Sequence, residues 1–503
     1  MGITPEMLAQ EKIPHAPRLV VNITIDQLRA DYLEAFSPLY GTEGFRKLLQ
    51  QGLVFYNSNY PFSPIDRASA TASLATGASP YYHSIVSQQW LDRQTLRPAY
   101  CTGKDQKPDE LSTSTVGDEL KMATEGKSKV FSIAPFDDAA IFSAGHAANA
   151  AFWIDDKTGL WCTSSYYLQQ LPTWLLSFNQ LSSPANDYSK QSWEPAFELS
   201  GKFNYFQHTE NSQRPFKHRF SGPDRFIQFK SSGMVNACVT EMAQRCVAHE
   251  TLGIDRVTDY LAVGYYAGTF EHRPVSECQI ELQDTYVRLD YEISKLIREV
   301  QKRVGAENVL FVVTSTGYSD AEGADYDKYR IPTGTFNMTR SANLLNVYMG
   351  AIWGSGRYVE SCYHNQMFLN QKLLESKRVS LTDACQRAQE FLTQLSGVRN
   401  VYSSLQLLTS TSEHIQKVRN GYNPSRSGDI LIEVSPGWKL YNEDNKETLL
   451  SRASFVQFPI IFFGAGTKAE RITDHVTIDR IAPSVAKAIR IRAPNACSAE
   501  PLF

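Results

Sequence analysis

Asp26 is the first residue whose type and position could do chemistry. It follows an apolar, β-branched run, Leu19–Ile25, that favours a β-strand, so its carboxylate would stand where that strand ends. Open α/β sheets bind their ligands at the carboxyl ends of their strands. The sequence therefore predicts a functional site beside Asp26.

Histidine and cysteine, the common zinc ligands, form no local motif. The eight cysteines include no Cys-x-x-Cys pair, which argues against a zinc ribbon or a thioredoxin-type site, and we expect most of them to be small buried apolar residues. The pair Asp474-His475 is expected in a surface loop beyond the last strand. His83 is expected to bond to backbone, and His146 either to line the cleft or to serve at a helix start.

The elements that would position Asp26 alternate between strands and helices. Short apolar runs favour strands, several of them apolar on both faces as in a parallel sheet covered by helices; they are Leu19–Ile25, Val130–Ala134, Tyr260–Tyr266, Val309–Thr314, Asp429–Val434 and Pro459–Phe463. Apolar residues at helical spacing predict helices at Gly41–Gly52, Asp284–Arg303, Ala342–Gly354 and Leu381–Leu395. The fold class expected is α/β.

One compact body with insertions fits the chain better than separate domains. We expect residues 1–17 to be a tail or the remnant of a secretory leader, and residues 18–503 to form one domain. Cap insertions are expected at about 150–250, which is rich in Trp and Tyr, and at about 320–425.

Composition excludes several classes of protein. With 503 residues, 42% hydrophobic and 20% charged, the chain is neither disordered nor fibrous. Its net charge of −3 gives no basic excess for nucleic acid or an anionic membrane. The longest apolar run, about Phe458–Ala465, is far short of the roughly 20 residues that span a bilayer, so no transmembrane segment is expected.

Segments along nearly the whole chain carry a family resemblance. They follow in the order Pro61–Pro64, Ala72–Gly77, His83–Val86, Ala144–Trp153, Asn420–Asn423, Arg426–Asp429 and Ile481–Ser484. This order resembles the type I phosphodiesterase/nucleotide pyrophosphatase branch of the alkaline phosphatase superfamily, and within it the bacterial phosphate-irrepressible alkaline phosphatases. The resemblance implies an alkaline-phosphatase-like three-layer sandwich with a mostly parallel central sheet.

The resemblance also implies a phosphoester hydrolase with two zinc ions, a Thr or Ser nucleophile, three carboxylate ligands and three His ligands. Only one carboxylate, Asp26, stands clearly at its expected position. Arg67 occupies the nucleophile position. The remaining ligand positions fall on Thr269 and Arg273, or on Gly268 and His272 in a shifted register, and on Thr316, Gly317 and Gln457.

Groups that would hold the substrate's oxygens are replaced as well. The expected Lys and Arg become Phe136 and Asp138, and the expected Asn becomes Gln88. Asp138 would add negative charge where a phosphate dianion should bind. We expect no catalytic residue and no bound metal at these positions, with His272 doubtful as a ligand, and we expect Arg67 to replace the metal by pairing with Asp26. Alternatively, Arg67 points to solvent and Asp26 caps a turn.

Three functions remain open. The first is a non-catalytic member that serves a binding, scaffold or regulatory role outside the cytoplasm, with an unidentified protein or a small anion as partner and no cofactor. The second is a metal-dependent phosphomonoesterase or phosphodiesterase with two zinc ions in a rearranged site: Ser63, Ser69 or Thr71 would be the nucleophile, and His272, Asp26, Asp137 or Asp138 would supply ligands. The third is an anion or nucleotide sensor anchored by Arg67. The first is the prediction, and a periplasmic or exported location goes with it.

Overall fold

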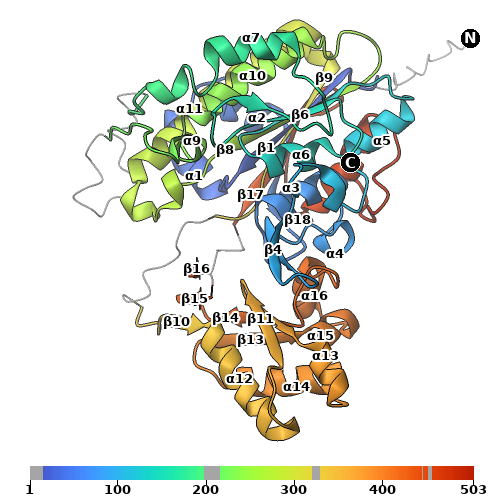
Figure 1. Ribbon diagram of the computed structural model, residues 1–503. Coiled ribbons are helices and arrows are strands. Elements are labelled where there is room, and N and C mark those ends of the chain that lie inside the picture. The colour runs from blue at the N-terminus through green and yellow to red at the C-terminus, as the bar shows by residue number, and fades with distance from the viewer. Residues whose placement is uncertain (1–14, 197–215, 320–328, 445, 451–455) are drawn as a thin grey trace, which may run out of the picture.

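The computed structural model describes residues 15–196, 216–319, 329–444, 446–450 and 456–503. The described chain forms two lobes (Figure 1). The larger lobe carries a nine-stranded sheet, and the smaller lobe consists of strands β10 to β16 with helices α12 to α16. The leader-like residues Met1–Gln10 lie outside the described residues.

The large sheet is mixed, with a parallel centre. Its strands, in spatial order, are β18 (Glu470–Thr477), β2 (Leu53–Asn59), β17 (Phe458–Gly464), β9 (Val309–Ser315), β1 (Leu19–Asp26), β8 (Asp259–Tyr266), β5 (Val130–Ile133), β6 (Ala150–Ile154) and β7 (Trp161–Cys162). Strands β9, β1, β8, β5 and β6 run parallel, whereas β17 is antiparallel to both of its neighbours. Because β1 pairs in register with β8 and β9, the carboxyl ends of these three strands meet at one edge.

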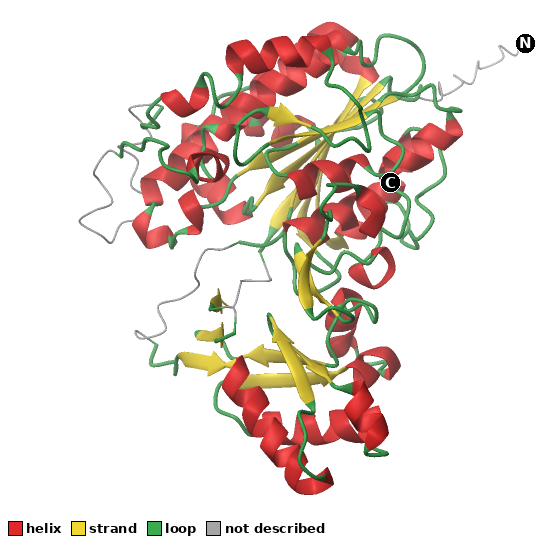
Figure 2. Ribbon diagram, viewed as in Figure 1, coloured by secondary structure: helices red, strands yellow, loops and turns green. Residues whose placement is uncertain are grey.

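Helices cover both faces of this sheet and make three layers (Figure 2). On one face, α2 (Phe45–Gln51), α10 (Val235–His249) and α11 (Gln279–Val304) pack on Val21, Ile23 and Ile25 of β1. On the other face, α3 (Arg67–Thr76), α5 (Val116–Ala123) and α17 (Ile481–Ala488) pack around Val20. Since side chains alternate along a strand, Asp26 shares the face of Val20, the face that α3 covers.

The remaining elements of the larger lobe are short. They are helices α1 (Ala30–Ala35), α4 (Pro80–His83), α6 (Asp137–Ala144), α7 (Thr173–Ser182) and α9 (Arg225–Lys230), and the hairpin of β3 (Gln89–Asp92) and β4 (Arg97–Tyr100). The described part of residues 150–250 contributes β6 and β7 to the large sheet and α10 to a covering layer, so it belongs to this body.

The smaller lobe has its own sheets and core. Strands β11 (Val359–Tyr363), β12 (Gln366–Leu369), β14 (Ile430–Val434) and β13 (Val398–Ser403) form an antiparallel sheet; β10 (Gly334–Asn337), β15 (Trp438–Asn442) and β16 (Glu447–Leu450) form another. Its helices are α12 (Met338–Trp353), α13 (Gln371–Ser376), α14 (Leu381–Leu392), α15 (Ser404–Thr409) and α16 (Glu413–Gly421). The strand predicted at Asp429–Val434 therefore forms as β14, away from the central sheet.

Polar contacts join the two lobes. Arg93, in the turn of the β3–β4 hairpin, binds Asp429 with both terminal nitrogens, at 3.0 and 3.2 Å. The Ser63 backbone N–H donates to the Lys417 carbonyl, and Asn420 donates to the Pro61 carbonyl. The smaller lobe is thus fixed to the larger one near the start of α3.

Two sequence expectations concern the surface and the thiols. The Asp474-His475 pair is exposed but lies within edge strand β18, so its prediction as a loop beyond the last strand is wrong. All eight cysteines are free, six of them buried. No described helix combines the length and the apolar character that crossing a bilayer requires.

Candidate functional site

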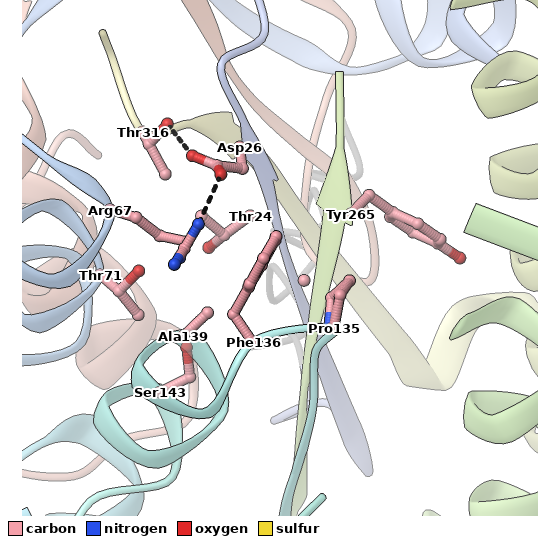
Figure 3. A pocket seen from close by; sticks show the side chains of 11 residues that line it. Thr24, Asp26, Arg67, Thr71, Pro135, Phe136, Ala139, Ser143, Tyr265 and Thr316 are labelled. Carbon is pink, nitrogen blue, oxygen red and sulfur yellow. Dashed lines mark hydrogen bonds and ion pairs between the residues drawn. The ribbon is translucent and has the colours of Figure 1, made fainter. Parts of the chain in front are cut away.

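A small pocket lies at the carboxyl edge of the central strands (Figure 3). Thr24 and Asp26 of β1 line it from one side, and Arg67 and Thr71 of α3 from another. Phe136, which precedes α6, contributes an aromatic wall. The sequence predicted a functional site at the carboxyl end of the strand that carries Asp26, and the pocket lies there.

Asp26 is buried, with 4% of its surface exposed. One carboxylate oxygen, Oδ1, accepts a hydrogen bond of 2.9 Å from the Thr316 hydroxyl, which in turn accepts from the Gln27 backbone N–H. The other oxygen, Oδ2, lies 3.5 Å from Arg67 Nη1. Burial raises the pKa of Asp26, although the Arg67 guanidinium opposes the rise.

Arg67 is the first residue of α3, where the Asp66 side chain caps the helix by accepting from the Ser69 backbone N–H. Its guanidinium grips Asp138 with two nitrogens, Nε at 2.8 Å and Nη2 at 3.2 Å. Its central carbon lies 3.6 Å from the centre of the Phe136 ring, a cation–π contact. Burial disfavours the charged guanidinium, but Asp138 and Asp26 outweigh it and hold the pKa of Arg67 above its ordinary value.

Asp138 is fully buried and well supplied with donors. Besides Arg67, it accepts hydrogen bonds from the Gln88 side chain at 2.7 Å and from the Ala139 backbone N–H at 2.7 Å. Burial alone would raise the pKa of Asp138, yet the Arg67 charge and these hydrogen bonds lower it. The expected excess of negative charge from Asp138 is therefore compensated within the protein, a pairing that the sequence analysis missed.

Several residues singled out in the sequence meet at this pocket. Thr316, Gln88, Phe136 and Asp138 surround the Asp26–Arg67 pair, which excludes the alternative of an Arg67 that points to solvent. The sequence did contain a signal for the Arg67–Asp138 pair. Compared with the family pattern, one position of the cleft gains a positive charge and another gains a negative charge, and two such changes favour an ion pair.

Other residues singled out in the sequence lie elsewhere or face away. Arg273 is exposed and pairs with Glu271, and His272 is exposed. Gln457 is exposed and offers its backbone carbonyl to the Ala30 N–H. Thr269 is buried but does not line the pocket. The backbone of Gly317 has a positive φ of 71°, and a Cβ there would meet the Tyr60 ring.

Of the three hydroxyls considered as nucleophiles, only Thr71 lines the pocket. Its buried Oγ1 has no hydrogen-bond partner among the described residues. The Ser69 hydroxyl is occupied with Asp66 in the cap of α3, and Ser63 lies in the segment bound to Lys417. A separate Ser73–His83 contact of 2.8 Å is no catalytic pair, because His83 Nδ1 accepts from the Ile85 backbone, which leaves Nε2 to donate.

The side chains around Asp26 do not fit the two zinc ions that the family resemblance implies. Zinc sites need at least three His, Cys or carboxylate ligands. Among the described residues, no three such side chains converge. Asp137, another possible ligand, accepts instead from Thr102 and Gln106, and burial together with Asp138 raises its pKa.

Comparison with known proteins shows what the chain is similar to. The family model of type I phosphodiesterase / nucleotide pyrophosphatase matches residues 20–458. The alkaline phosphatase PhoV of Synechococcus elongatus is 30% identical over 95% of this chain and 91% of its own length. The alkaline phosphatase PafA of Elizabethkingia meningoseptica is 28% identical over 99% of this chain and 96% of its own. A crystal structure of PafA superposes with a TM-score of 0.83 at 26% identity, covering 97% and 99% of the two chains.

These relatives correct the functional prediction. A non-catalytic binding, scaffold or regulatory role was predicted from the altered ligand positions, and it is contradicted because proteins similar over almost the full chain are named alkaline phosphatases. The loss of motif residues does not by itself imply the loss of activity, because one fold can hold different functional groups in the same cleft.

The three-layer fold predicted from the sequence is confirmed by the sheet and by its likeness to PafA. The matched family model covers most of the described strands of the large sheet and the pocket at their carboxyl edge. This chain belongs to the type I phosphodiesterase / nucleotide pyrophosphatase family, within the alkaline phosphatase superfamily.

Proposed function

We propose that this protein is a phosphoric ester hydrolase that acts at the pocket beside Asp26. The observation that carries the proposal is the similarity to proteins named alkaline phosphatases over 95% or more of the chain. The pocket supports it, because it lies at the carboxyl ends of the strands and combines a cation with a buried hydroxyl that has no partner among the described residues.

Thr71 is the candidate nucleophile. It lies one helical turn after Arg67, so both side chains project from the same face of α3 into the pocket. In the reaction, a bond forms between Thr71 Oγ1 and phosphorus while the bond to the alcohol oxygen breaks, and the hydroxyl proton ends on the departing alcohol. Water then attacks the phosphothreonine, releases phosphate and restores the hydroxyl.

Arg67 is the cation that would meet the phosphoryl oxygens. Its longest ion contact is the 3.5 Å separation of Nη1 from Asp26, whereas Nε and Nη2 are held by Asp138. A phosphoryl oxygen can therefore compete with Asp26 for Nη1 while Asp138 keeps the guanidinium in place.

We also propose that the protein works outside the cytoplasm, which cell fractionation with an antibody to the chain would test.

The test is hydrolysis of p-nitrophenyl phosphate and bis(p-nitrophenyl) phosphate by purified, folded protein. We expect turnover by the wild type, a loss of about a hundredfold or more in Thr71→Val, and measurable activity in Thr71→Ser, which keeps the hydroxyl. All three proteins are prepared identically, so a contaminating phosphatase would give them equal rates. Equal rates, or no turnover of either ester by the wild type, would sink the proposal.

A further inference from the structure

The guanidinium of Arg67 contacts two carboxylates and one aromatic ring. Each of its three nitrogens faces a carboxylate: Nε and Nη2 face Asp138, and Nη1 faces Asp26. The flat face of the group lies over the Phe136 ring. A planar cation with a fork of donors is suited to holding two anions at a fixed angle, which a lysine ammonium does less well.

All three charged side chains are almost fully withdrawn from water. The side chains of Arg67, Asp26 and Asp138 are 9%, 5% and 0% exposed. A buried carboxylate without a partner is costly, so the fold needs a cation at this point. In a two-metal site, divalent ions supply that charge. Here the Arg67 side chain of the protein supplies the positive charge.

We propose that Arg67 is an internal cation standing where the family resemblance places divalent metal ions, so that the pocket is complete without zinc. Asp26 and Asp138 are the two carboxylates that face it, and Thr316 and Gln88 donate further hydrogen bonds to Asp26 Oδ1 and to Asp138. Asp26 is then the partner of a guanidinium and no longer a metal ligand. The inference concerns charge balance in the folded chain, and it stands whether or not the pocket turns over phosphoric esters.

The chemistry of the surrounding positions points the same way. Thr316, Gly317, Gln457, Thr269 and Arg273 stand where ligands were expected, and none of these side chains is a usual zinc ligand. In the shifted register the positions are Gly268 and His272, and His272 is exposed and does not line the pocket. A second cation, Lys230, lies 4.7 Å from the centre of the Phe136 ring and pairs with Asp156. Phe136 is thus in contact with two cations, Arg67 and Lys230.

The first experiment measures metal in the full chain. Protein purified without chelator is submitted to elemental analysis, and its melting temperature is recorded with EDTA and with added zinc. We expect much less than one zinc per chain and no shift in melting temperature with either addition. Stoichiometric zinc, or a fall in melting temperature on chelation, would overturn the inference even if the variants below failed to fold.

The second experiment tests whether the same substitutions change the melting temperature in opposite directions with and without Arg67. The pair of substitutions Asp26→Asn and Asp138→Asn is introduced into the wild type and into Arg67→Met. In the wild type, the two substitutions leave the buried guanidinium of Arg67 without a carboxylate, so the melting temperature should fall by several degrees. In Arg67→Met, the same two substitutions remove buried carboxylates that have lost their cation, so the melting temperature should rise. Equal effects in both backgrounds would show that Arg67 acts through packing over Phe136 alone.

Arg93 provides the matched control. It too binds a buried aspartate, Asp429, and lies over an aromatic ring, Phe368 at 5.1 Å, but in the contact between the lobes. In an Arg93→Met background, Asp26→Asn and Asp138→Asn should lower the melting temperature as they do in the wild type, because Arg67 is still present. A rise there would show that the reversal does not depend on Arg67. Because every readout is metal content or melting temperature, failure of this inference and failure of the proposed hydrolysis are separate results.

Discussion

His146 shows how surroundings set the charge of a single residue. Its Nδ1 lies 3.1 Å from Asp118 Oδ2 and its Nε2 lies 3.0 Å from the Leu111 carbonyl oxygen, so both ring nitrogens face acceptors. Only the imidazolium form can donate to both. The hydrogen bond to Asp118 raises the pKa of His146 against the opposing effect of burial, and Asp109 adds to the rise.

This arrangement predicts a pH-dependent contribution to stability. Because the pKa of His146 is higher in the folded than in the unfolded chain, its contribution is complete below about pH 6.5 and is lost as the pH rises through the folded pKa. Replacing it, as in His146→Asn, should therefore cost more unfolding free energy at pH 6 than at pH 8. With the side chain about a third exposed, the difference should be below about 1 kcal/mol. Urea unfolding at both pH values measures it.

An equal cost of His146→Asn at pH 6 and at pH 8 would contradict this prediction. His146 would then not be protonated more readily in the fold than in the unfolded chain.

At this scale the sequence predicted the members of the site better than their contacts. Asp26 was singled out by its place at the end of a strand, and Arg67, Phe136 and Asp138 by the family resemblance, and these residues do meet. The Arg67–Asp138 pair was missed because the two residues are 71 positions apart, and the packing of α3 against α6 decides their approach. Thr71 could not be preferred over Ser69 without knowing that the cap of α3 occupies the serine.

The start of α3 is the element on which the site depends. Asp66 accepts from the Ser69 backbone N–H at 2.9 Å with one oxygen and from the Gln88 backbone N–H with the other at 2.6 Å. One carboxylate thus fixes the helix that carries Arg67 and the segment that carries Gln88. Both of those side chains bind Asp138.

Asp66→Ala should therefore cost more than an ordinary helix cap. We expect a loss of about 2 kcal/mol in unfolding free energy, at the upper end of the range for cap removal, because a second backbone donor also loses its acceptor. Ser380→Ala, at the cap of α14 in the smaller lobe, should cost about 1 kcal/mol. Chemical denaturation of both variants makes the comparison, and equal losses would mean that the Gln88 contact contributes nothing.

Elements with strong periodicity were predicted close to their observed bounds. The helix predicted at Asp284–Arg303 forms as Gln279–Val304, and the strand predicted at Val309–Thr314 forms as Val309–Ser315. The sequence did not indicate which sheet each strand joins. The apolar run at Asp429–Val434 resembles a central strand, but its partners β12 and β13 lie in the smaller lobe, and pairing between distant segments leaves no local signal.

At the scale of the whole molecule, the two lobes depend on a few buried polar contacts. Asp429 is 3% exposed and receives both terminal nitrogens of Arg93 together with the Leu369 backbone N–H. It therefore ties the hairpin of the larger lobe to β12 of the smaller one. The second lobe contact, between Ser63 and Lys417, lies four residues before the start of α3 and so links the smaller lobe to the scaffold of the pocket.

Arg93→Ala should loosen the smaller lobe selectively. Asp429 would lose the cation that faces it, and breaking such a partly buried pair should cost about 2 kcal/mol or more in unfolding free energy. We expect faster amide hydrogen exchange in β12 and β14, with β1 and β8 unchanged. Arg399→Ala, which removes an exposed ion pair with Glu433, should leave exchange in all four strands unaltered. Uniform acceleration across both lobes would contradict a local role for Arg93.

The eight thiols carry a consequence for how this protein reaches its native state. None is bridged, and burial raises the pKa of Cys101, Cys238 and Cys246, so little reactive thiolate forms there at neutral pH. The described fold therefore holds together without a disulfide bond. The scaffold should assemble equally well in reducing and in oxidising surroundings, and the sealed sulfurs should resist peroxide and alkylating reagents until the chain unfolds.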